Sequence, residues 1–440
     1  MTENGRRILA RLGWGHRGFR VRSGGAALLA LCMLLALPFI GDQIAFQQRM
    51  RWHNPDLRGW LANAVELAQS DGRTFYAANP FYIYPPFFLT LIWPLTKLPA
   101  PAAAAVFETA KWIALVVALR LAWRLCSRPG EDLPPIVALG SLLCTWRFID
   151  NDFGMGNINV LLLCMVLGGC WLATRGRWYA AGAIIAVAAA VKLTPALLLV
   201  FWAYKGWWRT WVGAAAGLLV CLVIWPAVWL GWEQNLQLLG GWYNAVVAGF
   251  VTQGAVRSEH TNQALVGILN RLFGPTIDAE RYVQVTLIEL SAAARNGLRL
   301  VLSAGVLGVL AWACRGRGRV ARRPLAHAAE LGLVFIGMLL LSGLSWKAHF
   351  VTLLLPYSVL LTYLADARHS RQRRVVGVSL AISFALCTLT SDIITPAGAN
   401  YAEALGLIAL GAVAAGAGLV AVCGTLRAEA PEPQDGGSIA

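Results

Sequence analysis

Residues 178–204 read WYAAGAIIAVAAAVKLTPALLLVFWAY, an apolar stretch that is interrupted near its middle by Lys192 and Pro195. A helix needs roughly 20 apolar residues to cross a bilayer, and each half of this stretch falls short of that length. We therefore expect a broken, re-entrant hairpin whose two ends lie on the same side of a membrane. Broken helices at membrane depth are tolerated where they line a polar cavity, so such a cavity is expected here.

Apolar runs of this kind continue along the whole chain. Of its 440 residues, 58% are hydrophobic and 13% are charged, whereas a soluble domain carries about 25% charged residues. We predict an all-α, polytopic membrane domain over residues 1–425, followed by a disordered cytoplasmic tail at 426–440. About ten helices are expected to cross the membrane: 24–41, 101–124, 133–147, 158–173, 210–232, 298–314, 325–343, 349–364, 375–391 and 402–423.

Arg and Lys side chains, which give the chain a net charge of +15, gather in short segments between the apolar runs. The positive-inside rule places such segments in the cytoplasm, beginning with the basic N-terminus at 1–23. All of these basic segments lie on the same side of the membrane only if two stretches do not cross it. These are residues 178–204 and the proline-broken stretch 84–98. The opposite, outer face then receives the loops 42–83 and 233–297 and short segments at 150–157, Lys192 and 345–349.

The first outer loop contains Asn54-Pro55-Asp56, which predicts a helix start because Asn suits the N-cap and Pro the first turn. Apolar residues then recur with a helical period, which predicts an amphipathic helix lying on the outer membrane surface. Asp56 would lie at the start of this helix, on its polar side. Its carboxylate either complements the helix dipole or takes part in catalysis, and spacing alone leaves both interpretations open.

Other polar residues also have two interpretations. A lone Lys between apolar half-helices costs about 2.5–3.5 kcal/mol at the bilayer centre, so Lys192 either faces a polar cavity or extends its ammonium to the membrane surface. The polar run 257–263 in the second outer loop either binds sugar hydroxyls and phosphate or is simply solvated. Asp150 and Asp152 could orient a substrate, but two carboxylates do not establish a metal site.

The nine cysteines and six histidines show no spacing that is typical of a metal site or a disulfide framework. We therefore predict that the protein requires no metal and no cofactor. Nucleic acid is not an expected partner, because no soluble basic face with accessible aromatic side chains is visible.

Six short motifs follow one another along the chain. They are Asp56-Leu57 with Gly72 and Tyr76; Tyr84-Pro85-Pro86-Phe87 through Leu98-Pro99; Gly156-Asn157-Ile158-Asn159; Val191-Lys192-Leu193-Thr194-Pro195; Asn262-Gln263-Ala264-Leu265 with Arg271; and Ser345-Trp346-Lys347-Ala348-His349. In this order and spacing they resemble the bacterial polyprenol-phosphate-mannose-dependent α-mannosyltransferases, within the GT-C class of membrane glycosyltransferases. Two positions depart from the family pattern, since Asn157 stands where Gln is usual and Ala348 where a His often stands.

The resemblance implies a GT-C fold and an inverting glycosyltransferase that moves a sugar, with mannose favoured, from a polyprenyl-phosphate donor to a hydroxyl of a glycolipid or glycan. The site would face the outside of a bacterial inner membrane. Asp56 matches the family's first-loop acid and would be the general base, with Asp42 as the alternative. A transporter or flippase, or an enzyme of the same class that uses lipid-linked arabinose or glucose, remains an open alternative.

The resemblance also implies donors for the departing lipid phosphate, which carries negative charge. These are Lys192 and His349, with Lys347, Arg257 and Tyr84 as further donor-binding candidates. An interfacial location without function is the alternative for His349 and Tyr84. Sugar or acceptor contacts are expected from Glu259, His260, Asn262, Gln263, Asn159, Asp152 and Trp346.

Overall fold

The computed structural model describes residues 54–70, 72–127, 134–248, 250, 258–275, 283, 285–315, 324–366, 372–391 and 395–428. The expected first span at 24–41, Asp42 and Arg257 lie outside these residues. Within them, every regular element is a helix. Pro opens several of these helices, as at Pro55, Pro86, Pro135 and Pro396, because it has no N–H to leave unsatisfied in a first turn.

Nine of the expected spans fall on helices of the described chain. These are α6 (Ala100–Cys126), α7 (Pro135–Met155), α8 (Asn159–Thr174), α11 with η3 and α12 (Arg209–Leu218, Leu219–Ile224 and Trp225–Leu230), α16 (Ala292–Ala313), α17 (Pro324–Leu340), η6 with α18 (Lys347–Leu353 and Leu354–Ala365), α19 (Arg373–Thr388) and α21 (Leu407–Ala428). In the described part, five helical segments are long and apolar enough to cross a membrane: Ala100–Cys126, Arg209–Leu230, Ala292–Ala313, Lys347–Ala365 and Leu407–Ala428. The fold is therefore that of a helical, multi-pass membrane protein, and the figure of about ten crossings stays a prediction.

Several helix boundaries differ from the expected ones; helix α16, for example, begins at Ala292 rather than 298. Helix α7 continues to Met155 rather than ending near 147, so that Asp150 and Asp152 lie within it and not in a loop. Helix α21 begins at Leu407 rather than 402, because α20 (Pro396–Ala404) precedes it and Gly406 turns the chain with a φ of 82°. The same helix continues to Ala428, beyond the expected start of the tail at 426.

The core of the bundle surrounds α18, in which every residue from Leu354 to Ala365 is buried. Helices α6, α7, α17, α19 and α21 pack around it. Helix α16 lies at the periphery, where Leu300, Val301 and Trp312 are each more than half exposed. An apolar surface of this kind suits contact with lipid.

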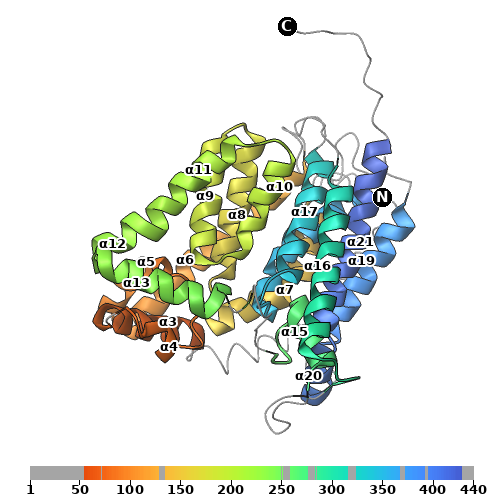
Figure 1. Ribbon diagram of the computed structural model, residues 1–440. Helices are drawn as coiled ribbons and strands as arrows, with labels where there is room; N and C mark the ends of the chain where they lie inside the picture. Colours follow the sequence, from red (N-terminus) through yellow and green to blue (C-terminus); the bar gives the residue numbers. More distant parts are fainter. Residues whose placement is uncertain are drawn as a thin grey trace.

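Residues 178–204 form two helices joined by a break. Helix α9 (Trp178–Val191) ends just before Lys192, whose backbone is extended, and α10 (Leu197–Tyr204) follows the short turn η2 (Thr194–Ala196). The rings of Trp178 and Trp207 lie 4.7 Å apart, so the chain returns to the end of the bundle from which it came (Figure 1). This geometry agrees with the expected hairpin, and its depth in a membrane stays a prediction.

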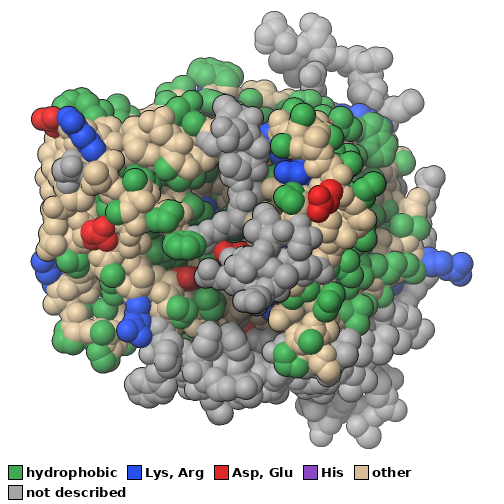
Figure 2. Space-filling model, turned by 60° about the horizontal axis from the view of Figure 1, so that its bottom comes forward, with side chains coloured by type: hydrophobic (Ala, Val, Ile, Leu, Met, Phe, Trp, Pro, Cys, Tyr) green, Lys and Arg blue, Asp and Glu red, His purple; other side chains and the backbone are tan. Residues whose placement is uncertain are grey.

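The two ends of the bundle carry different elements. At the end where α9 begins and α10 ends, Lys205 pairs with Glu330 at 2.8 Å and Arg427 donates to the carbonyl of Ala313. The opposite end carries α3 (Pro55–Gln69), α4 (Phe75–Ala78), α5 (Pro86–Ile92), α13 (Trp232–Trp242), α15 (Leu265–Phe273) and α20 (Figure 1). Figure 2 views the molecule from this second end and shows acidic side chains near the middle of the face.

Helix α3 is amphipathic, as its period predicts, but its apolar face is covered by protein. Leu57, Trp60, Ala64 and Leu67 are buried. Helix α5 and the following turn η1 (Trp93–Lys97) pack against α3, and the ring of Trp60 lies 4.9 Å from that of Phe88. The expected helix on the membrane surface is therefore a helix held against the bundle, which fixes the direction of its first turn.

Candidate active site

The start of α3 is pressed against the end of α7. Gly156 ends α7 in a left-handed conformation with a φ of 64°, and a Cβ at this position would lie 2.9 Å from the Cβ of Asn54. A glycine is therefore required both for the backbone angle and for the close approach. As a result, the first turn of α3 lies next to Asn157, and the Nδ2 of Asn157 donates to the Oδ2 of Asp56 at 2.6 Å.

Two amide side chains connect Asp56 with Lys192. The Oδ1 of Asn157 accepts a hydrogen bond from the Nδ2 of Asn159 at 2.6 Å. The Oδ1 of Asn159 in turn accepts from the Nζ of Lys192 at 2.9 Å. Residues from three separate motifs thus meet in one hydrogen-bonded chain.

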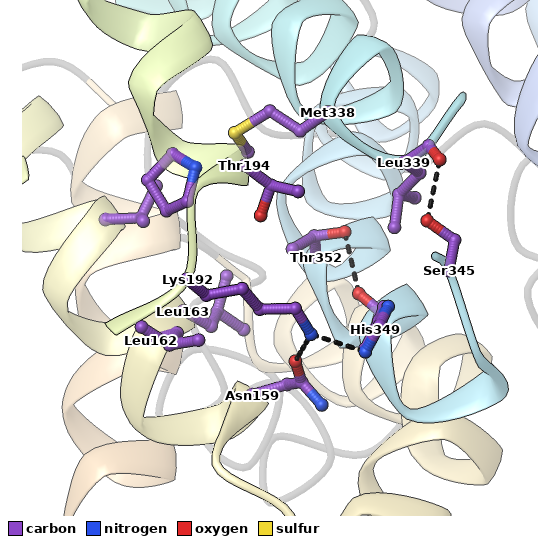
Figure 3. Close-up of a pocket in the computed structure, with 12 residues that line it drawn as sticks. Asn159, Leu162, Leu163, Lys192, Thr194, Met338, Leu339, Ser345, His349 and Thr352 are labelled. Carbon is purple, nitrogen blue, oxygen red and sulfur yellow. Dashed lines mark hydrogen bonds between the residues drawn. The ribbon is translucent and has the colours of Figure 1, made fainter. Parts of the chain in front are cut away.

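His349 completes the site beside Lys192 (Figure 3). The backbone N–H of Trp346 donates to the Nδ1 of His349 at 3.1 Å. Because Nδ1 accepts, the ring proton of neutral His349 is carried by Nε2, and this nitrogen contacts the Nζ of Lys192. Two hydrogen-bond donors therefore point at the same place. An oxyanion located there would accept from both, which is a suitable arrangement for a phosphate oxygen.

A cavity adjoins these two donors. Lys192, His349 and Asn159 meet at one end of it, and the hydroxyl-bearing Ser345 and Thr352 line it further along (Figure 3). Its remaining walls come from η2 and from two helix faces, with Leu162, Leu163 and Val166 on α8 and Met338 and Leu339 on α17. A ligand with one charged end and an apolar body would match this division.

A buried ion pair between α6 and α7 holds Asn159 in place. Lys111 of α6 and Asp152 of α7 are both fully buried, with 3.1 Å between Nζ and Oδ1. The same ammonium donates to the backbone carbonyl of Asp152 at 2.9 Å. The other carboxylate oxygen of Asp152 accepts the backbone N–H of Asn159 at 2.9 Å. Asp152 is therefore engaged in holding Asn159, and these contacts favour a supporting role over direct contact with a sugar.

Replacing Lys111 with Met is expected to destabilise the fold by about 3–5 kcal/mol, because it leaves the carboxylate of Asp152 buried without its counter-charge. Thermal unfolding of the purified protein measures this loss. The double variant Lys111→Met/Asp152→Asn removes both charges, and most of the lost stability should return. If Lys111→Met alone unfolds like the wild type, the ion pair does not support the site.

The environment of Asp56 favours a basic carboxylate. Burial raises the pKa of Asp56 above its usual value, and the hydrogen bond from Asn157 lowers it by a smaller amount. The nearby carboxylate of Asp152 adds to the increase, whereas Lys192 and Lys111 oppose it. The net effect is a raised pKa, which moves Asp56 toward the range of a working general base.

A second polar cluster positions the loop that leads into His349. The Oδ1 of Asn262 accepts from the backbone N–H of Ser345 at 3.0 Å, and its Nδ2 donates to the carbonyl of Gly343. Gln263 donates to the carbonyl of Glu403 at 2.7 Å. These two amides bind backbone groups, so their geometry favours holding the loop over contacting a sugar.

The other expected site residues lie around this cluster or away from the cavity. Lys347 pairs with Glu403 at 2.6 Å, and Glu403 also pairs with Arg147 at 3.5 Å. The backbone carbonyls of Glu259 and His260 accept from Arg271 and Gln263, respectively. The ring of Tyr84 lies 5.7 Å from that of Trp60, near the start of α5. The structure thus brings Asp56, Asn159, Lys192 and His349 together, and it places the 259–263 run and Lys347 in the neighbouring cluster.

Among the described residues, no group of three or more His, Cys, Asp or Glu side chains could hold a metal ion. The absence of a metal requirement stays a prediction.

Comparison with known proteins identifies the family. The family model of glycosyltransferase family 87 matches residues 82–343, which is more than half of the chain. The chain belongs to glycosyltransferase family 87. The matched region contains Lys192, Asn159 and the amides of the second cluster, and the resemblance inferred from the motifs is thereby confirmed.

Curated relatives of this family 87 member come from mycobacteria. A polyprenol-phosphate-mannose-dependent alpha-(1-2)-phosphatidylinositol pentamannoside mannosyltransferase of Mycobacterium tuberculosis is 27% identical over 305 residues, which cover 67% of this chain and 61% of the relative. A polyprenol-phosphate-mannose-dependent alpha-(1-2)-phosphatidylinositol mannoside mannosyltransferase of Mycolicibacterium smegmatis is 25% identical over 332 residues, with coverages of 71% and 69%. The chain thus spans about three fifths of the length of the first of these relatives. No solved structure matches it.

Sequence reasoning missed two residues of the site in this family 87 chain. Asn157 donates to Asp56, but the sequence indicated it only as an Asn at a position where the family usually has Gln. Lys111 is a charged residue inside an apolar run, but nothing in its spacing indicates Asp152, which lies 41 positions away, as its partner. A buried Lys needs a counter-charge, and that need is the one signal that could have prompted a search for such a partner.

Proposed function

We propose that this family 87 member transfers a sugar, with mannose as the favoured one, from a polyprenyl-phosphate donor to a hydroxyl of a membrane glycolipid or glycan. The observation that carries the proposal is the convergence of the Lys192 ammonium and the His349 Nε2–H at the polar end of a cavity with apolar walls. A lipid phosphate has the same division into a charged head and an apolar chain. The names of the mycobacterial relatives support mannose as the sugar and a phosphatidylinositol mannoside as one kind of acceptor.

The proposed reaction is a single displacement at the anomeric carbon. The carboxylate of Asp56 removes the proton of the acceptor hydroxyl, and the acceptor oxygen attacks the anomeric carbon from the face opposite the phosphate. The bond between the anomeric carbon and the phosphate oxygen breaks, and the electron pair leaves with the lipid phosphate. Lys192 and His349 stabilise the negative charge that develops on this leaving group. The configuration at the anomeric carbon is inverted.

The charge asymmetry of the bundle supports an extracytoplasmic site. Arg175, Arg177, Lys205 and Arg209 flank the ends of the 178–204 hairpin, whereas Lys192 lies at its tip. The positive-inside rule places the basic end in the cytoplasm. Under this orientation the tip of the hairpin and the first turn of α3 face the outside of a bacterial inner membrane, where a glycolipid acceptor is available.

Product analysis tests the proposal. Purified protein is mixed with polyprenyl-phosphate-mannose and a panel of membrane glycolipids, and products are identified by mass spectrometry, with polyprenyl-phosphate-glucose and polyprenyl-phosphate-arabinose as matched donors. We expect a mass increase of one hexose on an acceptor with the mannose donor. A product from another donor and none from mannose would contradict the sugar assignment. Movement of the labelled donor across a liposome membrane without any product would favour the transporter alternative.

A further inference from the structure

The hydrogen bonds between Lys192 and Asp56 all run in one direction. Lys192 donates to Asn159, Asn159 donates to Asn157, and Asn157 donates to Asp56, with donor–acceptor distances of 2.9, 2.6 and 2.6 Å. The chain therefore begins at a cation and ends at a carboxylate. We propose that Asn157 and Asn159 form an amide relay through which binding of the donor phosphate at Lys192 makes Asp56 a stronger base. This inference rests on the proposed function, because it uses Lys192 as the phosphate site and Asp56 as the base.

Both amides are held in a single orientation. The Oδ1 of Asn157 also accepts the backbone N–H of Ile158 at 2.7 Å, so its Nδ2 must face Asp56. The Oδ1 of Asn159 faces the Nζ of Lys192, and an ammonium group donates hydrogen bonds but has no lone pair with which to accept one. The backbone N–H of Asn159 is held by Asp152, which is itself paired with Lys111. Neither amide can flip without breaking two contacts, so the direction of the relay is a property of the fold.

The direction determines the effect on Asp56. A cation that donates to one amide polarises that amide. The polarised amide then donates a stronger hydrogen bond to the next amide, so hydrogen bonds in a chain reinforce one another. With the site empty, this polarisation stabilises the carboxylate form of Asp56. An anion bound at Lys192 neutralises the cation and draws its N–H groups away from Asn159. The relay then weakens, the carboxylate loses stabilisation, and the proton affinity of Asp56 rises.

Several other groups act on Asp56 and enter any measurement of its protonation. Asp152 of α7 raises the proton affinity of Asp56, and Lys111 of α6 and Lys192 lower it. The phenol of Tyr84 also lies within electrostatic range of Asp56. A bound phosphate repels the carboxylate through space as well, so the relay has to be separated from this direct effect.

Infrared difference spectroscopy of the full-length protein in lipid vesicles separates the two effects. The carboxyl band of Asp56, identified by its loss in Asp56→Asn, is titrated with and without polyprenyl phosphate, a ligand that carries no sugar. In the wild type we expect the ligand to raise the titration midpoint by about half a pH unit or more, which corresponds to the net free energy of one hydrogen bond. In Asn159→Leu the ligand-free midpoint should already be raised, and the ligand should add less than half of the wild-type shift.

Matched variants keep the test decisive. Asn235→Leu removes another buried amide, which bonds only to the backbone of residues 222 and 223 among the described contacts, and the full wild-type shift should persist in it. Asn159→Ala serves as a second relay variant if Asn159→Leu does not fold. An equal shift in the wild type and in either relay variant, or no shift in the wild type, overturns the relay. A wild-type shift without sugar transfer from any donor would instead contradict the proposed function, so the two failures are distinguishable.

Discussion

Asp56→Asn is expected to slow sugar transfer by about 10²- to 10⁴-fold, the range contributed by a general base. The substitution leaves an oxygen that can still accept the hydrogen bond from Asn157, so the position of α3 should not change. Burial raises the pKa of Asp56, which means that the ionised carboxylate costs the folded state some stability at a pH where it is deprotonated. A neutral Asn should therefore leave the thermal stability unchanged or slightly higher. Initial rates with a lipid-linked donor, together with thermal unfolding, measure both effects.

The same reasoning predicts the pH dependence of the wild-type enzyme. A base must be deprotonated to act, so transfer should decrease as the pH falls through the raised pKa of Asp56, at a higher pH than for an exposed Asp. Glu66→Gln on the exposed side of the same helix is the matched control and should transfer sugar at the wild-type rate. Wild-type transfer by Asp56→Asn would remove this residue from the mechanism and direct attention to Asp42.

Lys192→Met is expected to reduce kcat/KM for the donor by about 10²- to 10³-fold, as the loss of one preorganised donor to a developing negative charge does in other enzymes. Met has a similar length and keeps the contact with the apolar walls of the cavity. Since a buried charge is removed, the fold should not be destabilised. Transfer rates over a range of donor concentrations measure the effect.

Lys205, whose side chain is 6% exposed, provides the control for Lys192. Lys205 pairs with Glu330 at the opposite end of the bundle. Lys205→Met should lower the unfolding temperature, because Glu330 loses its partner, while kcat/KM for the donor in the remaining folded protein stays unchanged. If both Lys variants reduce transfer equally, Lys192 acts through stability and not through the phosphate.

The helical fold could be predicted because its signal is local. Each run of apolar residues indicates a helix by itself, and nine expected spans coincide with helices of the described chain. The errors arose where polar residues are buried by long-range pairing. Asp150 and Asp152 suggested an outer loop, but α7 continues through both, since Lys111 neutralises Asp152 inside the bundle. Partners of this kind depend on how the helices meet, which spacing along one chain does not reveal.

The candidate site could be predicted as separate residues but not as an arrangement. Asp56, Lys192 and His349 each stood out through charge, a helix break or a motif. Their connection through Asn157 and Asn159 required the close approach that Gly156 permits and the placement of His349 by the backbone N–H of Trp346. We expected the apolar face of α3 to lie on the membrane surface, but α5 and η1 cover it. Periodicity shows that one face of a helix is buried, and it does not show whether lipid or protein covers that face.

The apolar walls that α8 and α17 contribute to the cavity affect how the reaction must be measured. Under the proposed function, the lipid tail of the donor remains in the hydrocarbon phase while its phosphate occupies the polar end. The relevant concentration of donor is then its mole fraction in the two-dimensional membrane, and not its amount per volume of buffer. Added inert lipid dilutes the donor within the surface and slows the enzyme, even when the bulk concentrations of enzyme and donor are held constant.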